Sequence, residues 1–317
     1  MALIFGFTGK TQLGEIARVL QAMSPQALLA SPALLIGIVL LIAGFGFKIA
    51  AVPFQLWVPD VYEGAPTPVT AYLSVASKAA GFAIILRVFF SAFDISSLSL
   101  NWGMIFAVLS VFSMIIGNVV AIPQTNIKRM LGYSSIAQAG YLMVGLATLG
   151  FAPASVTSGQ SGIIFFLATY AFTNLGAFIA IIAISGKLDS DLIADYTGMG
   201  RRAPLLALAL TLCLISLIGM PPAAGFMAKF YIFRAAVDNY LLWLVIIAVL
   251  NSVISAYYYL RVVKVMWLGK PTSDEKVPSS GAPRLALFLC CLGVLVLGII
   301  PGLLMRLAEL AGKMFAF

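Results

Sequence analysis

Long apolar segments recur along almost the entire chain, and they constrain its fold more than any other feature. Each segment has the roughly 20 residues that an α-helix needs to cross a hydrocarbon core about 30 Å thick. Of the 317 residues, 62% are hydrophobic and only 9% are charged. Typical soluble domains are about 45–50% apolar and about 25% charged. The sequence therefore predicts an all-α, polytopic bundle of transmembrane helices.

Hydropathy and turn residues predict about eight full membrane spans. They run over residues 31–58, 68–92, 102–122, 129–150, 160–185, 203–236, 239–268 and 284–314. Residues 1–9 are apolar but too short to span, and no basic stretch precedes them as it would in a signal peptide. We interpret them as the end of a preceding helix, so we expect the chain to start late.

Lysine and arginine are distributed unevenly between the connections. The connections at 122–131, 185–204 and 261–284 carry ten of the 19 basic residues: Lys128, Arg129, Lys187, Arg201, Arg202, Arg261, Lys264, Lys270, Lys276 and Arg284. The opposite side, with both chain ends, carries five: Lys10, Arg18, Arg234, Arg306 and Lys313. Because lysine and arginine are enriched in cytoplasmic connections, we expect the first group to be cytoplasmic. Topology thus explains the net charge of +8 better than nucleic-acid binding does.

Four basic residues remain, and all lie inside predicted spans: Lys48, Lys78, Arg87 and Lys229. Arg87 lies near a span end, from which its side chain can reach the interface. A charged lysine deeper in the membrane costs several kcal/mol unless it faces a polar interior or gives up its proton. Burial therefore makes the charge of the three lysines sensitive to neighbouring charges, as a proton relay requires. The alternative is that each lysine only donates hydrogen bonds between helices.

Proline interrupts two of the spans that carry a lysine. Pro53 follows Lys48, whereas Pro221 and Pro222 precede Lys229 in its span. Proline has no amide hydrogen, so it frees a backbone carbonyl and kinks or breaks a helix. Broken helices within a membrane line cavities or are enclosed by protein, as in many ion transporters. The sequence predicts two discontinuous helices, with a plain kink as the alternative.

Acidic residues are absent from the middle of the predicted spans. All 11 lie in connections or near span ends: Glu15, Asp60, Glu63, Asp94, Asp189, Asp191, Asp195, Asp238, Asp274, Glu275 and Glu309. Buried charges are normally paired. Either Lys48 and Lys78 are neutral, or their partner is missing from this chain.

Other chemically distinctive side chains point to structural roles. There is no histidine, which removes the commonest metal ligand and near-neutral proton carrier. The cysteines Cys213, Cys290 and Cys291 lie in apolar segments without metal-type spacing, so we interpret them as small buried hydrophobic residues. We interpret the tyrosines at 257–259, with Trp267, as an interfacial aromatic belt.

Three runs of residues carry a specific resemblance. They are GFGFKIAAVPFQLWVPDVYEGAPTPVTAYLSVASK at 44–78, TNIKRMLGYSSIAQAGYLMVG at 125–145 and GMPPAAGFMAKFYIF at 219–233. Through them the chain resembles, over essentially its whole length, the antiporter-like membrane subunits of respiratory complex I, and among these the N type. The resemblance implies a fold of usually about fourteen helices, built from two inverted five-helix repeats that each contain one broken helix.

The resemblance also implies a division of the chain. Residues 1–30 would be the remnant of a preceding helix plus an outer loop. Residues 31–92 would be the last two helices of the first antiporter repeat, and residues 101–268 the second repeat. Residues 269–317 would form a cytoplasmic loop and the final span.

In the family, lysines at the positions of Lys48, Lys78 and Lys229 act as proton-relay groups. Lys48 would lie on the first broken helix, Lys78 on the next helix and Lys229 on the second broken helix. A glutamate on an earlier helix pairs with the first of these lysines in the family. That glutamate would precede Met1, so we expect the chain to be truncated at its N-terminus.

Two positions depart from related subunits, which often carry histidine where this chain has Gln55 and Gln138. Glutamine can hold water by hydrogen bonds but cannot carry a proton, so the relay would run through water and lysine. Lys128 could join the same polar axis. Its place in a cytoplasmic connection favours a role in topology instead.

The resemblance implies a proton-translocating membrane-arm subunit of NADH:quinone oxidoreductase, in which electron transfer from NADH to quinone drives proton transport. Its partners would be the other membrane-arm subunits, the lipid bilayer and protons, with no nucleic acid. No cofactor is expected in this chain; NAD, FMN, quinone and iron–sulfur clusters would belong elsewhere in the complex. We expect a multi-pass protein of the cell membrane, or of an organellar or thylakoid-type membrane. The alternatives are a subunit of a related cation/proton antiporter or membrane-bound hydrogenase, and a non-pumping structural subunit.

Overall fold

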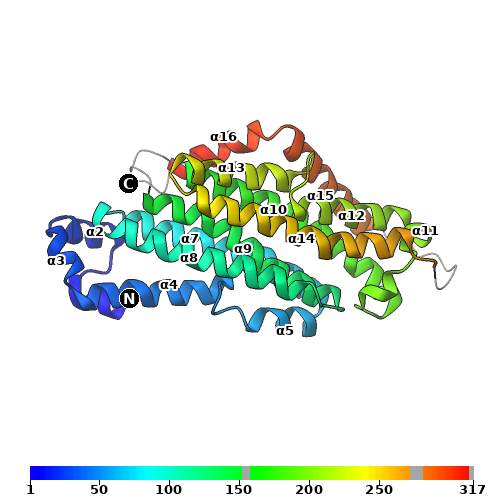
Figure 1. Ribbon diagram of the computed structural model, residues 1–317, viewed down its shortest axis with the longest axis horizontal. Helices are drawn as coiled ribbons and strands as arrows, with labels where there is room; N and C mark the ends of the chain where they lie inside the picture. Colours follow the sequence, from blue (N-terminus) through cyan, green and yellow to red (C-terminus); the bar gives the residue numbers. More distant parts are fainter. Residues whose placement is uncertain (152–157, 272–280, 314–317) are drawn as a thin grey trace.

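The computed structural model describes residues 1–151, 158–271 and 281–313; the predicted loop lysine Lys276 lies outside these ranges. Helices dominate the described ranges, where the only β-type contact is an isolated bridge between Asn126 and Leu192. The helices form an elongated bundle, with α2 (Leu13–Gln21) and α3 (Pro25–Leu29) at one end and α11 (Met199–Arg202) at the other (Figure 1). This architecture confirms the predicted all-α class. We call the end with α11 the basic end, because the predicted basic connections lie there.

Seven helical segments within the described ranges are long and apolar enough to cross a membrane. They are α4 (Pro32–Ile49), Thr67–Ala92, Leu98–Ala121 of α8 (Ser96–Ala121), α9 (Ile127–Phe151), α10 (Ser158–Leu188), α14 (Leu242–Leu268) and α15 (Gly281–Ile299). The second of these combines α6 (Thr67–Tyr72), a π-helical segment (Leu73–Ser77) and α7 (Lys78–Ala92). The predicted span over 203–236 consists of two shorter helices, α12 (Pro204–Ile218) and α13 (Ala224–Asp238).

Both predicted helix breaks are present. α4 ends at Ile49, and α5 (Trp57–Gly64) begins after a break that contains Pro53. Ala50 opens this break with a left-handed backbone, φ 61°. Its first amide after the turn remains bonded to the helix, since Ala51 donates to Gly46 O at 2.8 Å. The helix α4 therefore ends at the break rather than bending smoothly through it.

The segments at the two ends of the chain differ from the predictions. The predicted outer loop after the short helix α1 (Ala2–Thr8) contains α2 and α3. The predicted single span over 284–314 is wrong: α15 ends at Ile299, and α16 (Gly302–Lys313) follows as a separate helix that packs on α10 (Figure 1). Pro301 between them explains the interruption, because proline lacks an amide hydrogen and disfavours helical backbone in the residue before it.

α9 is the central helix of the bundle. In its most apolar 18-residue window, 94% of the residues are buried, compared with 17% for α15. Glycine permits this burial by letting helices approach closely. A Cβ built on Gly140 would lie only 2.8 Å from the backbone nitrogen of Met114 in α8. Most polar side chains of the candidate site lie on α9 or face it.

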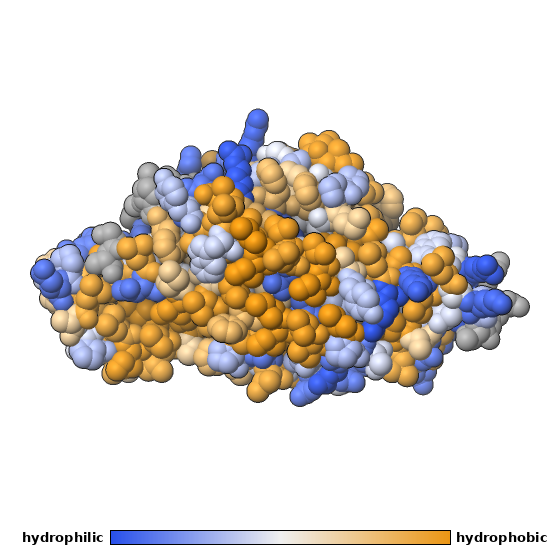
Figure 2. Space-filling view, in the orientation of Figure 1, coloured by the Kyte–Doolittle hydropathy of each residue, from blue (hydrophilic) through white to orange (hydrophobic). Residues whose placement is uncertain are grey.

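Apolar side chains also cover much of the outside of the bundle. Figure 2 shows a broad hydrophobic surface over its middle, with most hydrophilic residues near the ends and edges. On α8, for example, Val108, Phe112 and Val119 are exposed. A bilayer can cover such a surface, whereas exposing it to water would be unfavourable.

Candidate functional site: two buried lysines along the central helix

Lys229 lies in the second turn of α13, the helix that follows the second break, and its side chain is almost fully buried. Its Nζ donates to Ile218 O at 2.8 Å and to Ser252 Oγ at 3.0 Å, and it lies 4.1 Å from the centre of the Tyr141 ring. A helix C-terminus carries partial negative charge, so the end of α12 favours an ammonium group here. The face of the tyrosine ring also attracts a cation.

The break itself supplies the acceptors at this site. The carbonyls of Leu217 and Ile218 have no helical partner because α12 ends there. Gln138 of α9 donates to Leu217 O at 3.0 Å, and Lys229 donates to Ile218 O. Gln138 therefore belongs to the same polar cluster as Lys229.

Lys78 lies at the start of α7, directly after the π-helical segment. The side chain is 4% exposed, and its Nζ donates to Ser135 O of α9. It also lies 5.9 Å from the centre of the Tyr170 ring of α10. Asn174 donates to Ser74 Oγ at 2.6 Å and so ties the π-helical segment to α10. Short π-helical turns are frequent at functional sites.

A small cavity and several hydroxyl groups lie next to Lys229. The cavity measures about 10 Å³ and is lined by Gln138, Tyr170, Thr173, Ser216 and Lys229, among others. Tyr170 is thus a neighbour of both amines. Thr173 and Ser216 are hydrogen-bonded to each other at 3.0 Å. The volume is roughly what a single water molecule needs.

Lys48 lies apart from this cluster. It occupies the last turn of α4, and its side chain is exposed beside the exposed Phe47. The expectation that it is buried like Lys78 and Lys229 is wrong for this chain. Within the described ranges none of the three lysines forms an ion pair with a carboxylate, as the positions of the acidic residues predict.

The remaining predicted residues of the breaks lie at the edge of the site. Pro53, Pro221 and Pro222 are exposed within their breaks. Gln55 is buried beside the first break, and its Oε1 has no hydrogen-bond partner among the described residues. Gln55 does not line the cavity next to Lys229. Of the two glutamines, only Gln138 lines the cavity next to Lys229.

The tyrosines on α14 were misassigned from the sequence. Tyr258 and Tyr259 are fully buried, and only Tyr257 is exposed, at 61%. Tyr259 is hydrogen-bonded to Ser134 Oγ, and Tyr258 donates to Asn118 Oδ1 at 3.0 Å. The interfacial-belt interpretation is therefore wrong for two of the three. Consecutive helical residues point in directions about 100° apart, so a run of identical residues does not reveal which one is buried.

Asn118 of α8 joins three helices beside Lys229, and sequence reasoning missed it. Its Nδ2 donates to the Tyr141 hydroxyl and to Asn251 Oδ1, both at 3.3 Å. Its Oδ1 accepts from Tyr258. Asn251 and Tyr258 lie seven residues apart on one face of α14, a polar stripe that the sequence could have revealed. This network fixes the ring that lies against the Lys229 amine.

We expect Asn118→Leu to destabilise the protein. The substitution keeps the side-chain volume similar but removes the partner of three buried polar groups, each of which costs about 1–3 kcal/mol when unsatisfied. Thermal unfolding in detergent should show a clear fall in Tm. Asn239→Leu is the matched control, because the side chain of Asn239 donates only to Ala235 O of α13, the helix that Asn239 caps. Equal losses of Tm in both variants would contradict the role of Asn118.

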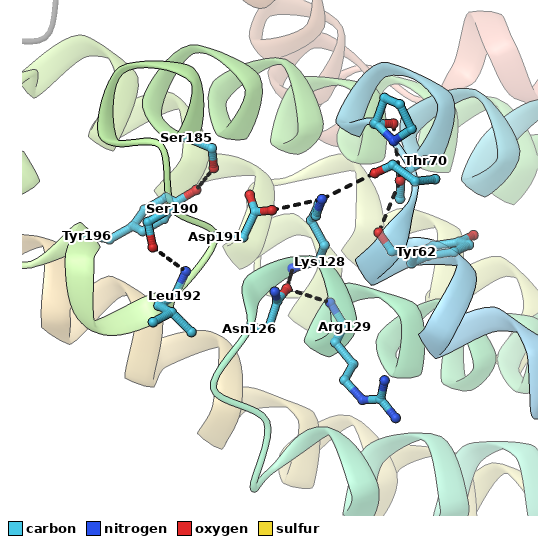
Figure 3. Close-up of polar contacts among 12 residues, drawn as sticks. Tyr62, Thr70, Asn126, Lys128, Arg129, Ser185, Ser190, Asp191, Leu192 and Tyr196 are labelled. Carbon is cyan, nitrogen blue, oxygen red and sulfur yellow. Dashed lines mark hydrogen bonds and ion pairs between the residues drawn. The ribbon is translucent and has the colours of Figure 1, made fainter.

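The side chains of both basic residues at the start of α9 are bonded to acidic residues, and Figure 3 shows the contacts of Lys128. Lys128 Nζ lies 2.8 Å from Asp191 Oδ2 and donates to Ala65 O at 3.2 Å. Arg129 Nη1 lies 2.7 Å from Asp60 Oδ1. Lys128 therefore belongs to the first turn of a helix and is buried, whereas the sequence placed it in a cytoplasmic connection. A purely topological role does not explain that environment.

No group of three or more histidine, cysteine, aspartate or glutamate side chains that could hold a metal ion is found in the described parts of the chain. Cys213 and Cys290 are buried as predicted, and Cys291 is half-buried.

Comparison with known proteins assigns the family. Residues 1–255 match the family described as "NADH:quinone oxidoreductase/Mrp antiporter, TM". The chain belongs to this family. The match, together with the long apolar helices, makes it a multi-pass protein of the cell membrane. The family resemblance inferred from the three sequence runs is confirmed.

Relatives and solved structures align along nearly all of the chain. NADH-quinone oxidoreductase subunit N of Dehalococcoides mccartyi is 51% identical over 316 residues, covering 99% of this chain and 65% of the relative. A chain of respiratory complex I from Thermus thermophilus is 32% identical, with a TM-score of 0.77, covering 96% of this chain and 63% of that one. A chain of the archaeal membrane-bound sulfane sulfur reductase is 29% identical, with a TM-score of 0.86, covering 99% and 62%. The chain thus spans slightly less than two thirds of the length of these relatives.

Proposed function

We propose that the protein is a proton-translocating membrane-arm subunit of an NADH:quinone oxidoreductase. The observation that carries the proposal is the pair of buried amines, Lys78 and Lys229, which share Tyr170 as a neighbour and have no carboxylate partner among the described residues. The similarity to subunits named for this enzyme supports it. Electron transfer from NADH to quinone, with its FMN and iron–sulfur clusters, would take place in other subunits.

The environment of the lysines suits reversible protonation. Carbonyl, hydroxyl and ring groups stabilise an ammonium without neutralising it, so its proton is held according to the local electrostatic potential. Lys78 would take up a proton and pass it towards Lys229 through the hydroxyl groups and cavity beside Tyr170. Gln138 would hold water on this path. Lys229 would release the proton towards the end of the bundle opposite the basic end.

Lys48 has a separate place in this proposal. Its exposed position at the first break leaves it free to face a carboxylate outside the described residues. Residues 31–92 and 101–268 would belong to two inverted repeats, each with one broken helix. Lys48 would then be the lysine at the broken helix of the first repeat, and Lys229 the lysine at the broken helix of the second.

Lys78→Ala, in the full-length subunit within the assembled complex, tests the proposal. We expect NADH-driven proton uptake into proteoliposomes to fall at least about tenfold, because a positioned proton-transfer group typically contributes 10²–10⁴-fold. Lys10→Ala is the control, since Lys10 forms only an exposed 3.6 Å ion pair with Glu15. Unchanged pumping by a normally assembled Lys78→Ala complex would establish a non-pumping structural subunit instead. Dependence of the signal on Na⁺ would assign a cation/proton antiporter.

A further inference from the structure

Lys128 lies where three segments of the chain meet. These are the first turn of α9, the end of the half-helix α5, and the connection between α10 and α12 (Figure 3). Its Nζ lies 2.8 Å from Asp191 Oδ2 in that connection and donates to Ala65 O, at the C-terminal cap of α5. One ammonium group therefore holds both neighbouring segments against the central helix.

The burial of the pair is unequal. The side chain of Lys128 is only 7% exposed, whereas that of Asp191 is 24% exposed. A buried ammonium depends on its partner, because removing one member of a buried pair leaves an uncompensated charge. Asp191 Oδ1 is buried without a hydrogen-bond partner among the described residues, so its second oxygen retains unused acceptor capacity. Asp191 is thus the more exposed member of the pair.

The backbone around the pair is ordered by its own hydrogen bonds. Ile127 N donates to Asp191 O at 2.9 Å, and Ile193 N donates to Thr125 O at 2.8 Å. Asn126 Oδ1 accepts from the amide of Lys128 at 2.8 Å and so caps the start of α9. The helix N-terminus also favours the negative charge of Asp191. The pair is therefore built into the fold, unlike an ion pair between two mobile surface side chains.

α5 links this pair to Lys78. Tyr62 lies on α5, one turn before Ala65, and its hydroxyl is hydrogen-bonded to Ser135 Oγ at 3.3 Å. The carbonyl of the same Ser135 accepts from Lys78. Thr70 of α6 donates to Tyr62 O at 3.2 Å, which ties α5 to the helix that leads into Lys78. The position of α5 therefore determines how Tyr62, Ser135 and Lys78 meet.

We propose that the Lys128–Asp191 ion pair is a positioning latch at the basic end of the bundle. It holds α5 against α9, and through Tyr62 and Ser135 it sets how Lys78 exchanges its proton. Lys128 and Asp191 are positioning residues in this scheme, because they act on Lys78 through other groups. The inference rests on the proposed function and adds a means by which the connection between α10 and α12 controls the first of the two buried amines.

The test uses the assembled complex with the full-length subunit, in proteoliposomes. Proton uptake and quinone reduction are measured together for Lys128→Met, Asp191→Asn, the double variant and Lys128→Arg, each normalised to subunit content. Since breaking a buried pair is strongly unfavourable, we expect each single neutral variant to lower protons pumped per quinone by about fivefold or more. Lys128→Arg should retain at least about half of the ratio, because guanidinium keeps the charge and the donors.

The double variant distinguishes a latch that controls pumping from an ion pair with only a structural role. Removal of both charges leaves no unpaired charge, so a pair with only a structural role would allow normal pumping in the double variant. We expect the ratio to stay low, because Ala65 O has lost its donor and α5 its anchor. Normal pumping by the double variant would overturn the proposal.

Two further variants keep the test decisive. Asp195→Asn is the matched control in the same connection. Asp195 accepts a hydrogen bond from Ser190 at 2.5 Å, within the connection itself. This variant should leave the pumping ratio unchanged. If Lys128→Met complexes do not accumulate, Asp191→Glu replaces them: it keeps the charge but shifts it by one methylene, and an unchanged ratio would refute the latch. If Lys78→Ala lost pumping while the variants of Lys128 and Asp191 pumped normally, the latch alone would be rejected. Normal pumping in Lys78→Ala and in the variants of Lys128 and Asp191 would reject the proposed function as well.

Discussion

Lys229→Met should reduce NADH-driven proton uptake by the assembled complex roughly a hundredfold, the lower end of what positioned proton-transfer groups contribute. Methionine fills a similar volume, so packing against Tyr141 is retained while the amine is lost. The carbonyl of Ile218 then loses its side-chain donor. Proton uptake into proteoliposomes, compared with quinone reduction in the same sample, measures the effect.

Lys229→Arg tests whether pumping requires only a positive charge at this position or a group that can exchange its proton. Arginine keeps a positive charge beside the end of α12 but does not release its proton. We expect it to assemble well and to pump as poorly as Lys229→Met. Lys264→Met, which changes an exposed lysine of α14, serves as the control and should pump normally. Full pumping by Lys229→Arg would show that only the charge of Lys229 matters.

Gly225→Ala should prevent stable assembly of the second broken helix. A Cβ at this position would lie 1.8 Å from Ser216 O and 2.7 Å from Ser216 C, which are backbone atoms of α12. The two half-helices would have to separate, and Gly225 N would lose its 3.0 Å hydrogen bond to Ser216 Oγ. Lys229, one turn further along α13, would move away from Ile218 O. Native gels and thermal unfolding should show a strong loss of assembled complex.

Gly44→Ala is the matched control for this substitution. Gly44 lies within α4, and a Cβ built there meets no atom within 4 Å. Alanine is favoured over glycine in a helix interior by about 0.5–1 kcal/mol, so this variant should be neutral or slightly stabilised. If Gly225→Ala assembled as well as Gly44→Ala, close contact between α12 and α13 would not be required.

Much of the site was predictable because its signals are local in the sequence. Pro53 and the Pro221–Pro222 pair marked the two breaks, since a residue without an amide hydrogen interrupts the interior of a helix. Lys78 and Lys229 stood out because charged residues within apolar segments are rare and costly. Lys128 was harder to interpret, since its partner Asp191 lies far along the chain, in a different connection.

The features that sequence reasoning missed depend on helix faces. Lys48 and Lys78 both lie within apolar stretches, yet only Lys78 is buried. In the same way Tyr257 is exposed and Tyr258 is buried. In a membrane, lipid-facing and protein-facing surfaces are both apolar, so hydropathy does not distinguish the two sides of a helix. Small residues and polar side chains that bond across helices make that distinction.

The sequence by itself determined the membrane-spanning all-α class, the two helix breaks, and the lack of carboxylates in the middle of the spans. Length, hydropathy and proline are sufficient for these features because each acts within a single segment. Only the tertiary structure decided that α9 is central, that Asn118 meets Tyr258 across 140 residues, and that Lys128 joins α5 to Asp191. Those contacts depend on which helices pack together, and close approach at glycines such as Gly140 and Gly225 sets that packing.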